Sequence, residues 1–191
     1  MSVSLLVRAL FVLALSLGGA AAVNVTAGVN VTAGVIGVWS SGTPEVPVPK
    51  NAAVASNDYR VCRNLFEHES ETIPGKLEFI SNLWVCKEAT NNHAYSDKVG
   101  DYEVLVDDAG AYTWKDVTPE DPFFSDAMII GGTQDDSSNY YICRVTVDGD
   151  QNVAGKYYFG YDNTWRCTVN EADKFVVSYL GNAPIQVLVK E

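Results

Sequence analysis

An internal duplication that includes all four cysteines is the strongest constraint on the fold of this chain. The separation between Cys62 and Cys86 equals the separation between Cys143 and Cys167. Matching blocks accompany both pairs in the same order: a W-x3-T-P-E-x-P block, a Y-x-x-C-R block, a G-K pair and a W-x-C block. We therefore predict two tandem repeats, at residues 35–113 and 114–191.

The cysteines follow the repeat, which bears on how they pair. Four cysteines allow three disulfide connectivities. Equal spacing inside equivalent blocks favours the pairs Cys62–Cys86 and Cys143–Cys167, and disulfides are the usual state of cysteines in secreted chains. The alternative, a pair of tetrahedral metal half-sites, is disfavoured because the chain lacks C-x-x-C spacing. We expect neither a metal site nor a cofactor.

The N-terminus has the features of a secretory signal. Arg8 precedes an apolar run at residues 10–17, and small residues end the segment at Ala22, which predicts a signal peptide over residues 1–22. The alternative, a membrane anchor, needs a run of about 20 apolar residues, and the run here is shorter. We expect a secreted, extracellular protein without a membrane span.

A duplicated hexapeptide follows at residues 23–34. It contains two N-x-T sequons, at Asn24 and Asn30, and both are candidate glycosylation sites in a secreted chain. The segment reads as a mobile arm because chain termini are usually mobile. Its β-branched alternation leaves an added strand as the alternative.

The body of the chain is rich in short β-branched and aromatic runs separated by Gly, Asn, Asp and Pro. This pattern is typical of antiparallel sandwiches and barrels, and no segment has a long helical period. A repeat of about 75 residues is small for an independent core. We therefore predict an all-β fold in which two pseudo-symmetric repeats pack as one antiparallel sandwich-like or barrel-like unit.

Charge and composition exclude several functions. The formal net charge is −11, from 24 acidic and 13 basic residues, which is the wrong sign for binding nucleic acid or anionic lipid. The two histidines, His68 and His93, lie outside any nucleophile motif, and neither is duplicated. We expect no enzyme activity. A polysaccharide hydrolase using Glu103 and Asp101 is the weaker alternative, because no acid pair is duplicated.

One polar constellation occurs in both repeats. Each has an acid-bearing turn before its Y-x-x-C-R block and a Gly-Lys turn after it; the residues are Asn57, Asp58 and Lys76 in the first repeat and Gln134, Asp135, Asp136 and Lys156 in the second. A carboxylate and an ammonium together accept and donate hydrogen bonds to vicinal hydroxyls, and nearby aromatic rings pack on sugars. The alternative is that these are ordinary solvated turns.

The blocks resemble the core of DM9 repeat proteins, which reads GGTDxDG, then LYVCRA, then PGK. The matching residues are Ile129 to Thr133, Tyr140 to Arg144 and Gly155-Lys156 in the second repeat, and Tyr59 to Arg63, Pro74 to Lys76 and Tyr102 to Val106 in the first. The resemblance covers about residues 50–191. Gln134 stands where the family has its first acid, and the first repeat lacks the GGTD block.

The resemblance implies a tandem-repeat, all-β, mannose-type lectin for pattern recognition or agglutination. It also implies that the turn acids and the lysine of each repeat form the sugar site. Two sites on one chain give avidity for a multivalent glycan. The alternative is a secreted structural or protein-interaction module without sugar binding. A homodimer remains open on sequence alone.

Overall fold

The structure is a computed structural model that describes residues 34–65, 71–89, 94–95, 100–124, 127–133, 138–147 and 151–191. The predicted signal peptide, the arm with Asn24 and Asn30, and the turn residues Gln134, Asp135 and Asp136 lie outside the described residues.

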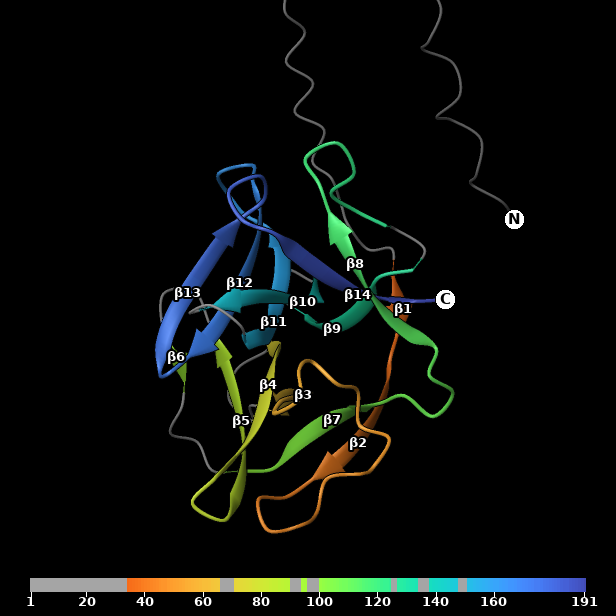
Figure 1. The fold of residues 1–191 in the computed structure, drawn as a ribbon, viewed down its shortest axis with the longest axis vertical. Coiled ribbons are helices and arrows are strands. Elements are labelled where there is room, and N and C mark those ends of the chain that lie inside the picture. The colour runs from red at the N-terminus through yellow and green to blue at the C-terminus, as the bar shows by residue number, and fades with distance from the viewer. Residues whose placement is uncertain are drawn as a thin grey trace, which may run out of the picture.

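Strands are the only regular elements among the described residues, as expected for an all-β fold (Figure 1). Their bounds are β1 Val35–Ile36, β2 Val38–Gly42, β3 Arg60–Leu65, β4 Thr72–Ile80, β5 Leu83–Ala89, β6 Ala94–Tyr95, β7 Tyr102–Val106, β8 Tyr112–Val117, β9 Ile129–Thr133, β10 Asn139–Val147, β11 Gln151–Phe159, β12 Trp165–Glu171, β13 Lys174–Tyr179 and β14 Ile185–Lys190.

The strands form one branched sheet. Its main path runs β13-β12-β11-β10-β9-β4-β3-β7-β2, while β14 joins β10 to β8 and β5 joins β4 to β6. The pairs are antiparallel except that β1 runs parallel to β9. In Figure 1 the strands from β2 to β7 lie below those from β8 to β14, and β9 connects the two groups by pairing with β4.

The two groups of strands share one hydrogen-bonding register. In β3–β4, Cys62 lies opposite Gly75. In β10–β11, Cys143 lies opposite Gly155. The lysine after each glycine therefore occupies the same place in its hairpin.

The core is divided unequally between the two groups. One large buried cluster draws on both groups and includes Val61, Leu105, Tyr141 and Tyr157. A smaller cluster around Leu77 belongs to the first group.

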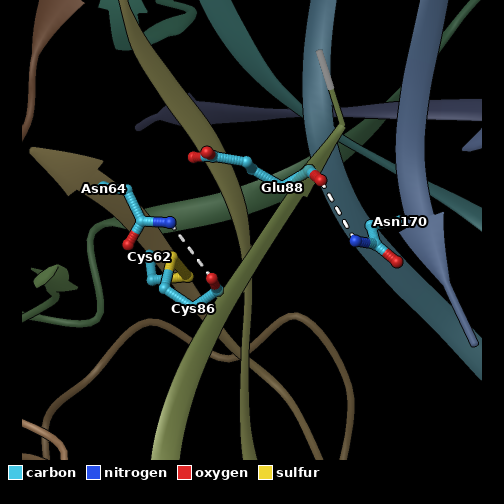
Figure 2. Close-up of a disulfide and its surroundings, with 5 residues drawn as sticks. All are labelled: Cys62, Asn64, Cys86, Glu88 and Asn170. Carbon is cyan, nitrogen blue, oxygen red and sulfur yellow. Dashed lines mark hydrogen bonds between the residues drawn. A yellow bond between two sulfur atoms is a disulfide. The ribbon is translucent and has the colours of Figure 1, made fainter. Parts of the chain in front are cut away.

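Both disulfides predicted from the spacing are present. Cys143–Cys167 joins β10 to β12 inside the large cluster. Cys62–Cys86 joins β3 to β5 inside the small cluster and is drawn in Figure 2. Each bridge therefore crosses over the strand between its two cysteines.

Side-chain amides reinforce the first disulfide and link it to the second group of strands. Asn64 donates a hydrogen bond of 3.1 Å to the backbone carbonyl of Cys86. Asn170 on β12 donates one of 3.1 Å to the carbonyl of Glu88 on β5 (Figure 2). The β5 backbone is thus held from both sides.

The repeated tryptophan and arginine of the sequence blocks contact each other. The Arg63 guanidinium lies 4.2 Å from the centre of the Trp39 ring, and its Nε is 2.5 Å from Glu103. Arg144 lies over Trp114 in the same way, at 4.5 Å. Glu103, an acid of the hydrolase alternative, therefore serves as an ion-pair partner that fixes β3 against β7.

Candidate functional site

The first candidate centre surrounds Lys76 on β4. Its side chain is 1% exposed, and its Nζ lies 2.5 Å from a Glu171 carboxylate oxygen and 3.7 Å from Glu78. The same ammonium lies 4.3 Å from the centre of the Tyr59 ring. Glu171 comes from β12, so the other group of strands supplies a carboxylate to this lysine.

The charges around Lys76 continue into a network. Lys87, opposite Lys76 on β5, lies 3.4 Å from Glu78 and 3.0 Å from Asp173. Burial alone would lower the pKa of Lys87, but the hydrogen bond to Asp173 and the carboxylate charges outweigh it and raise that pKa. Cations and carboxylates thus alternate from β4 and β5 to the turn after β12.

The backbone of that turn explains how Asp173 reaches the network. Ala172 and Asp173 join β12 to β13 with positive φ values of 48° and 61°. Two consecutive residues of this kind make the tight turn whose twist suits an antiparallel hairpin, and Asp adopts it more readily than most residues. The turn therefore projects Asp173 beside β5.

The second candidate centre surrounds Lys156 on β11. Its side chain is fully buried. Its Nζ lies 4.4 Å from the Tyr140 ring centre and 5.0 Å from the Tyr158 ring centre. Burial lowers the pKa of Lys156 to about 8, while Glu71 and Glu88 oppose this shift and Arg166 adds to it.

Two polar side chains of β12 lie on the same face as Lys156. Thr168 is directly opposite Lys156 in the antiparallel register. Its hydroxyl is buried and has no hydrogen-bond partner among the described residues. Arg166 lies between the Tyr158 and Tyr179 rings, at 5.3 and 5.4 Å. This face therefore combines an ammonium, a hydroxyl, a guanidinium and tyrosine rings.

The predicted site residues are partly brought together. Lys76 and Lys156 occupy equivalent positions, and Asp58 lies close enough to the first centre for its charge to contribute to raising the Tyr59 pKa, which burial and two glutamates raise to about 12. Asn57 lies exposed in the bend before β3. The second turn, with its three candidate residues, lies outside the described residues.

The expectation that each Gly-Lys pair forms a solvated turn is wrong. Gly75-Lys76 lies within β4 and Gly155-Lys156 within β11, and both lysines are buried. The glycines serve close packing of neighbouring strands, because a Cβ on Gly155 would lie 2.0 Å from the Thr168 carbonyl oxygen. A residue type common in turns here allows a tight strand pair.

Sequence reasoning also missed the carboxylates of Glu171 and Asp173. They come from the other repeat, and aligning Cys86 with Cys167 places the uncharged Thr90 and Asn92 at the equivalent positions. Because these acids are not duplicated, a search for repeated features passes over them. The one sequence feature that could have indicated them is that two acids, Glu171 and Asp173, follow shortly after the W-x-C block that ends at Cys167.

The structure offers no metal centre in the part that it describes, since no group of three or more His, Cys, Asp and Glu side chains is suitably placed. Over the same residues, no helix is long and apolar enough to cross a membrane.

The lowered pKa of Lys156 predicts that the folded protein gains stability as the pH rises from about 8 to about 10. In this window the folded chain holds fewer protons on Lys156 than the unfolded chain, so the free energy of unfolding rises with pH. This contribution is complete above the ordinary pKa of 10.5 and is lost as the pH falls through about 8.

Melting temperatures of the wild type and Lys156→Met at about pH 7.5 and 9.5 check this prediction. The wild type should gain relative to the variant at the higher pH. Buried tyrosines act oppositely above pH 10, but equally in both proteins. A difference in melting temperature that does not change with pH would contradict the burial of the ammonium.

Comparisons with known proteins agree with the fold. The family model of the DM9 repeat matches residues 55–161. No curated protein sequence matches the chain. The crystal structure of the nematode sperm cell motility protein MFP2B is similar, with a TM-score of 0.57 and 16% sequence identity. The similarity covers 81% of this chain and 46% of the MFP2B chain, so this chain spans less than half of that protein.

Proposed function

Because the chain belongs to the DM9 repeat family, we propose that it is a non-enzymatic carbohydrate-binding protein that recognises mannose-type glycans through its strand-borne lysines. The observation that carries the proposal is the placement of Lys76 and Lys156 in one register. Each ammonium lies against a tyrosine ring. Both centres thus contain an ammonium beside a tyrosine ring.

These groups have the chemistry that a sugar requires. An ammonium donates hydrogen bonds to hydroxyl oxygens, and a carboxylate accepts them from hydroxyl protons. Vicinal hydroxyls present both functions at a fixed spacing, and bonds to charged groups are stronger than neutral ones. Tyrosine rings pack against the apolar C–H face of a pyranose. Mannose has hydroxyl oxygens that accept hydrogen bonds, hydroxyl protons that donate them, and an apolar pyranose face.

We also propose that the protein acts outside the cell. Two disulfides are present among the described residues, and such bonds persist in oxidising compartments. The signal-like segment and the sequons at Asn24 and Asn30 agree with this location.

The shared register of the two strand groups supports repeats at 35–113 and 114–191.

Calorimetric titration of the mature protein with methyl α-mannoside and with mannan tests the proposal. We expect saturable binding by the wild type and its loss in the double variant Lys76→Met/Lys156→Met. Lys190→Met is the matched control, because Lys190 is exposed near the C-terminus. Folding of each variant is checked by its melting curve. No saturable binding of either compound by folded wild-type protein would overturn the proposal.

The second candidate is a secreted scaffold or protein-interaction module. It is favoured by the fold shared with MFP2B, whose name describes a motility protein. It is also favoured by the ion pairs that already occupy Lys76. A saturable complex with a protein partner that mannan does not displace would support this candidate.

A further inference from the structure

We infer that each sugar site is completed by a glutamate from the opposite group of strands: Glu171 serves the site of Lys76, and Glu71 serves the site of Lys156. The inference rests on the proposed function and names the carboxylates that accept hydrogen bonds from the sugar. It makes both sites composite, because the lysine and the glutamate of each site come from different groups of strands.

Glu171 reaches the first site from the end of β12. Its side chain is 17% exposed, and a carboxylate oxygen lies 2.5 Å from the Lys76 ammonium. The neighbouring Asn170 donates a hydrogen bond to the Glu88 carbonyl on β5, which holds the end of β12 against the first group of strands. Burial raises the pKa of Tyr59 to about 12, and the Glu171 charge adds to this rise. Glu171 therefore lies beside both the ammonium and the ring of this site.

Glu71 reaches the second site from the position directly before β4. It adjoins Thr72, which pairs with Thr133 at the end of β9. The Tyr140 hydroxyl on β10 donates a hydrogen bond of 3.4 Å to the Glu71 carboxylate. The Tyr140 ring in turn lies 4.4 Å from the Lys156 ammonium. Glu71 therefore belongs to the same group of side chains as Lys156.

The carboxylate charges that act on Lys156 also come from the first group of strands. Burial lowers the pKa of this lysine to about 8, and Glu71 and Glu88 oppose the shift. Glu88 is fully buried, whereas Glu71 is partly exposed. Glu71 is therefore the one of these two carboxylates that a ligand can contact from solvent.

The two glutamates do not occupy equivalent positions in the sequence. In the first repeat Thr90 stands at the position of Glu171 when the second cysteines of the repeats are aligned. In the second repeat Gln151 stands at the position of Glu71 when the Gly-Lys pairs are aligned. The exchanged carboxylate thus approaches its lysine from the end of β12 in the first site and from the start of β4 in the second.

A lysine and a glutamate placed together can bind a neutral diol without separating. An ammonium has several donors and a carboxylate has several lone-pair positions, so each keeps bonding capacity after one contact between them. One sugar hydroxyl accepts from the ammonium while the adjacent hydroxyl donates to the carboxylate. The ion pair stays intact, which avoids the cost of leaving a buried charge without its partner. In each site the glutamate is more exposed than the lysine, so the carboxylate is the group that meets the sugar first.

Removing one glutamate at a time and following both sites in the same protein tests the inference. The wild type, Glu171→Gln and Glu71→Gln are titrated with methyl α-mannoside, and their backbone amide signals are followed by nuclear magnetic resonance. We expect Glu171→Gln to raise the dissociation constant read at Lys76 at least about tenfold more than that read at Lys156, the loss of one hydrogen bond to a charged group. Glu71→Gln should have the opposite preference.

Glu45→Gln and Glu120→Gln are the matched controls, because both glutamates are exposed and each lies in a different group of strands. Both should titrate as the wild type does, and melting curves check that every variant is folded. If Glu171→Gln does not fold, Glu171→Asp replaces it, because the shorter side chain keeps the charge but withdraws the carboxylate. This variant should also weaken binding at Lys76 more than at Lys156.

The results separate this inference from the proposed function. Equal dissociation constants at both lysines in either glutamate variant would overturn the composite sites and leave sugar binding in place. A selective loss at Lys156 in Glu171→Gln, or at Lys76 in Glu71→Gln, would assign each glutamate to the site of its own group and would also overturn the inference. No saturable shift in the folded wild type would refute the proposed function and, with it, the inference that rests on it.

Discussion

Gly155→Ala is expected to destabilise the protein by about 3 kcal/mol or more, because overpacking against backbone cannot be relieved by a side-chain rotation. A Cβ at this position on β11 would lie 2.0 Å from the carbonyl oxygen of Thr168 on β12. The equivalent atom on Gly75 would lie 2.1 Å from the Lys87 carbonyl oxygen. Urea unfolding followed by circular dichroism measures the loss.

Gly100→Ala is the matched control for this prediction. Among the described residues, no atom lies within 4 Å of a Cβ on Gly100, so the free energy of unfolding of this variant should be within about 0.5 kcal/mol of the wild type, as for most surface substitutions. A Gly155→Ala variant as stable as this control would contradict the close approach of β11 and β12.

Replacing both Cys143 and Cys167 by alanine is expected to lower the melting temperature by about 6–12 °C. The bridge closes a loop of 24 residues. Removing the constraint that such a bridge places on the unfolded chain costs about 3 kcal/mol of stability. In a chain of this length, each kcal/mol of lost stability lowers the melting temperature by about 2–4 °C. Thermal unfolding monitored by circular dichroism measures it.

The Cys62→Ala/Cys86→Ala variant provides the comparison, because that bridge spans the same number of residues. A loss of similar size is expected there, since the loop entropy is equal. An unchanged melting temperature in both variants would contradict the stabilising role of the bridges.

The disulfides and the fold class could be predicted because they depend on local or duplicated patterns. Equal cysteine spacing selected the correct pairing, which the structure confirms. Alternating β-branched and aromatic residues predicted strands such as β10 and β14, and these strands are present.

The surroundings of the lysines could not be predicted because they depend on tertiary packing. Glu171 and Asp173 approach Lys76 and Lys87 from far along the chain and have no duplicated counterpart. The burial of Lys76 and Lys156 was also missed, since a Gly-Lys pair is typical of a solvated turn. Only the position of each pair inside a sheet shows that the glycine makes room for the next strand.

Mapping a bound sugar onto the chain tests the central claim most directly. We would titrate the isotopically labelled mature protein with methyl α-mannoside and follow its backbone amide signals by nuclear magnetic resonance. The account predicts saturable shifts at Lys76 and Lys156 and at the residues that neighbour them on β4 and β11. Shifts confined to another surface, or no shifts at saturating sugar, would contradict it.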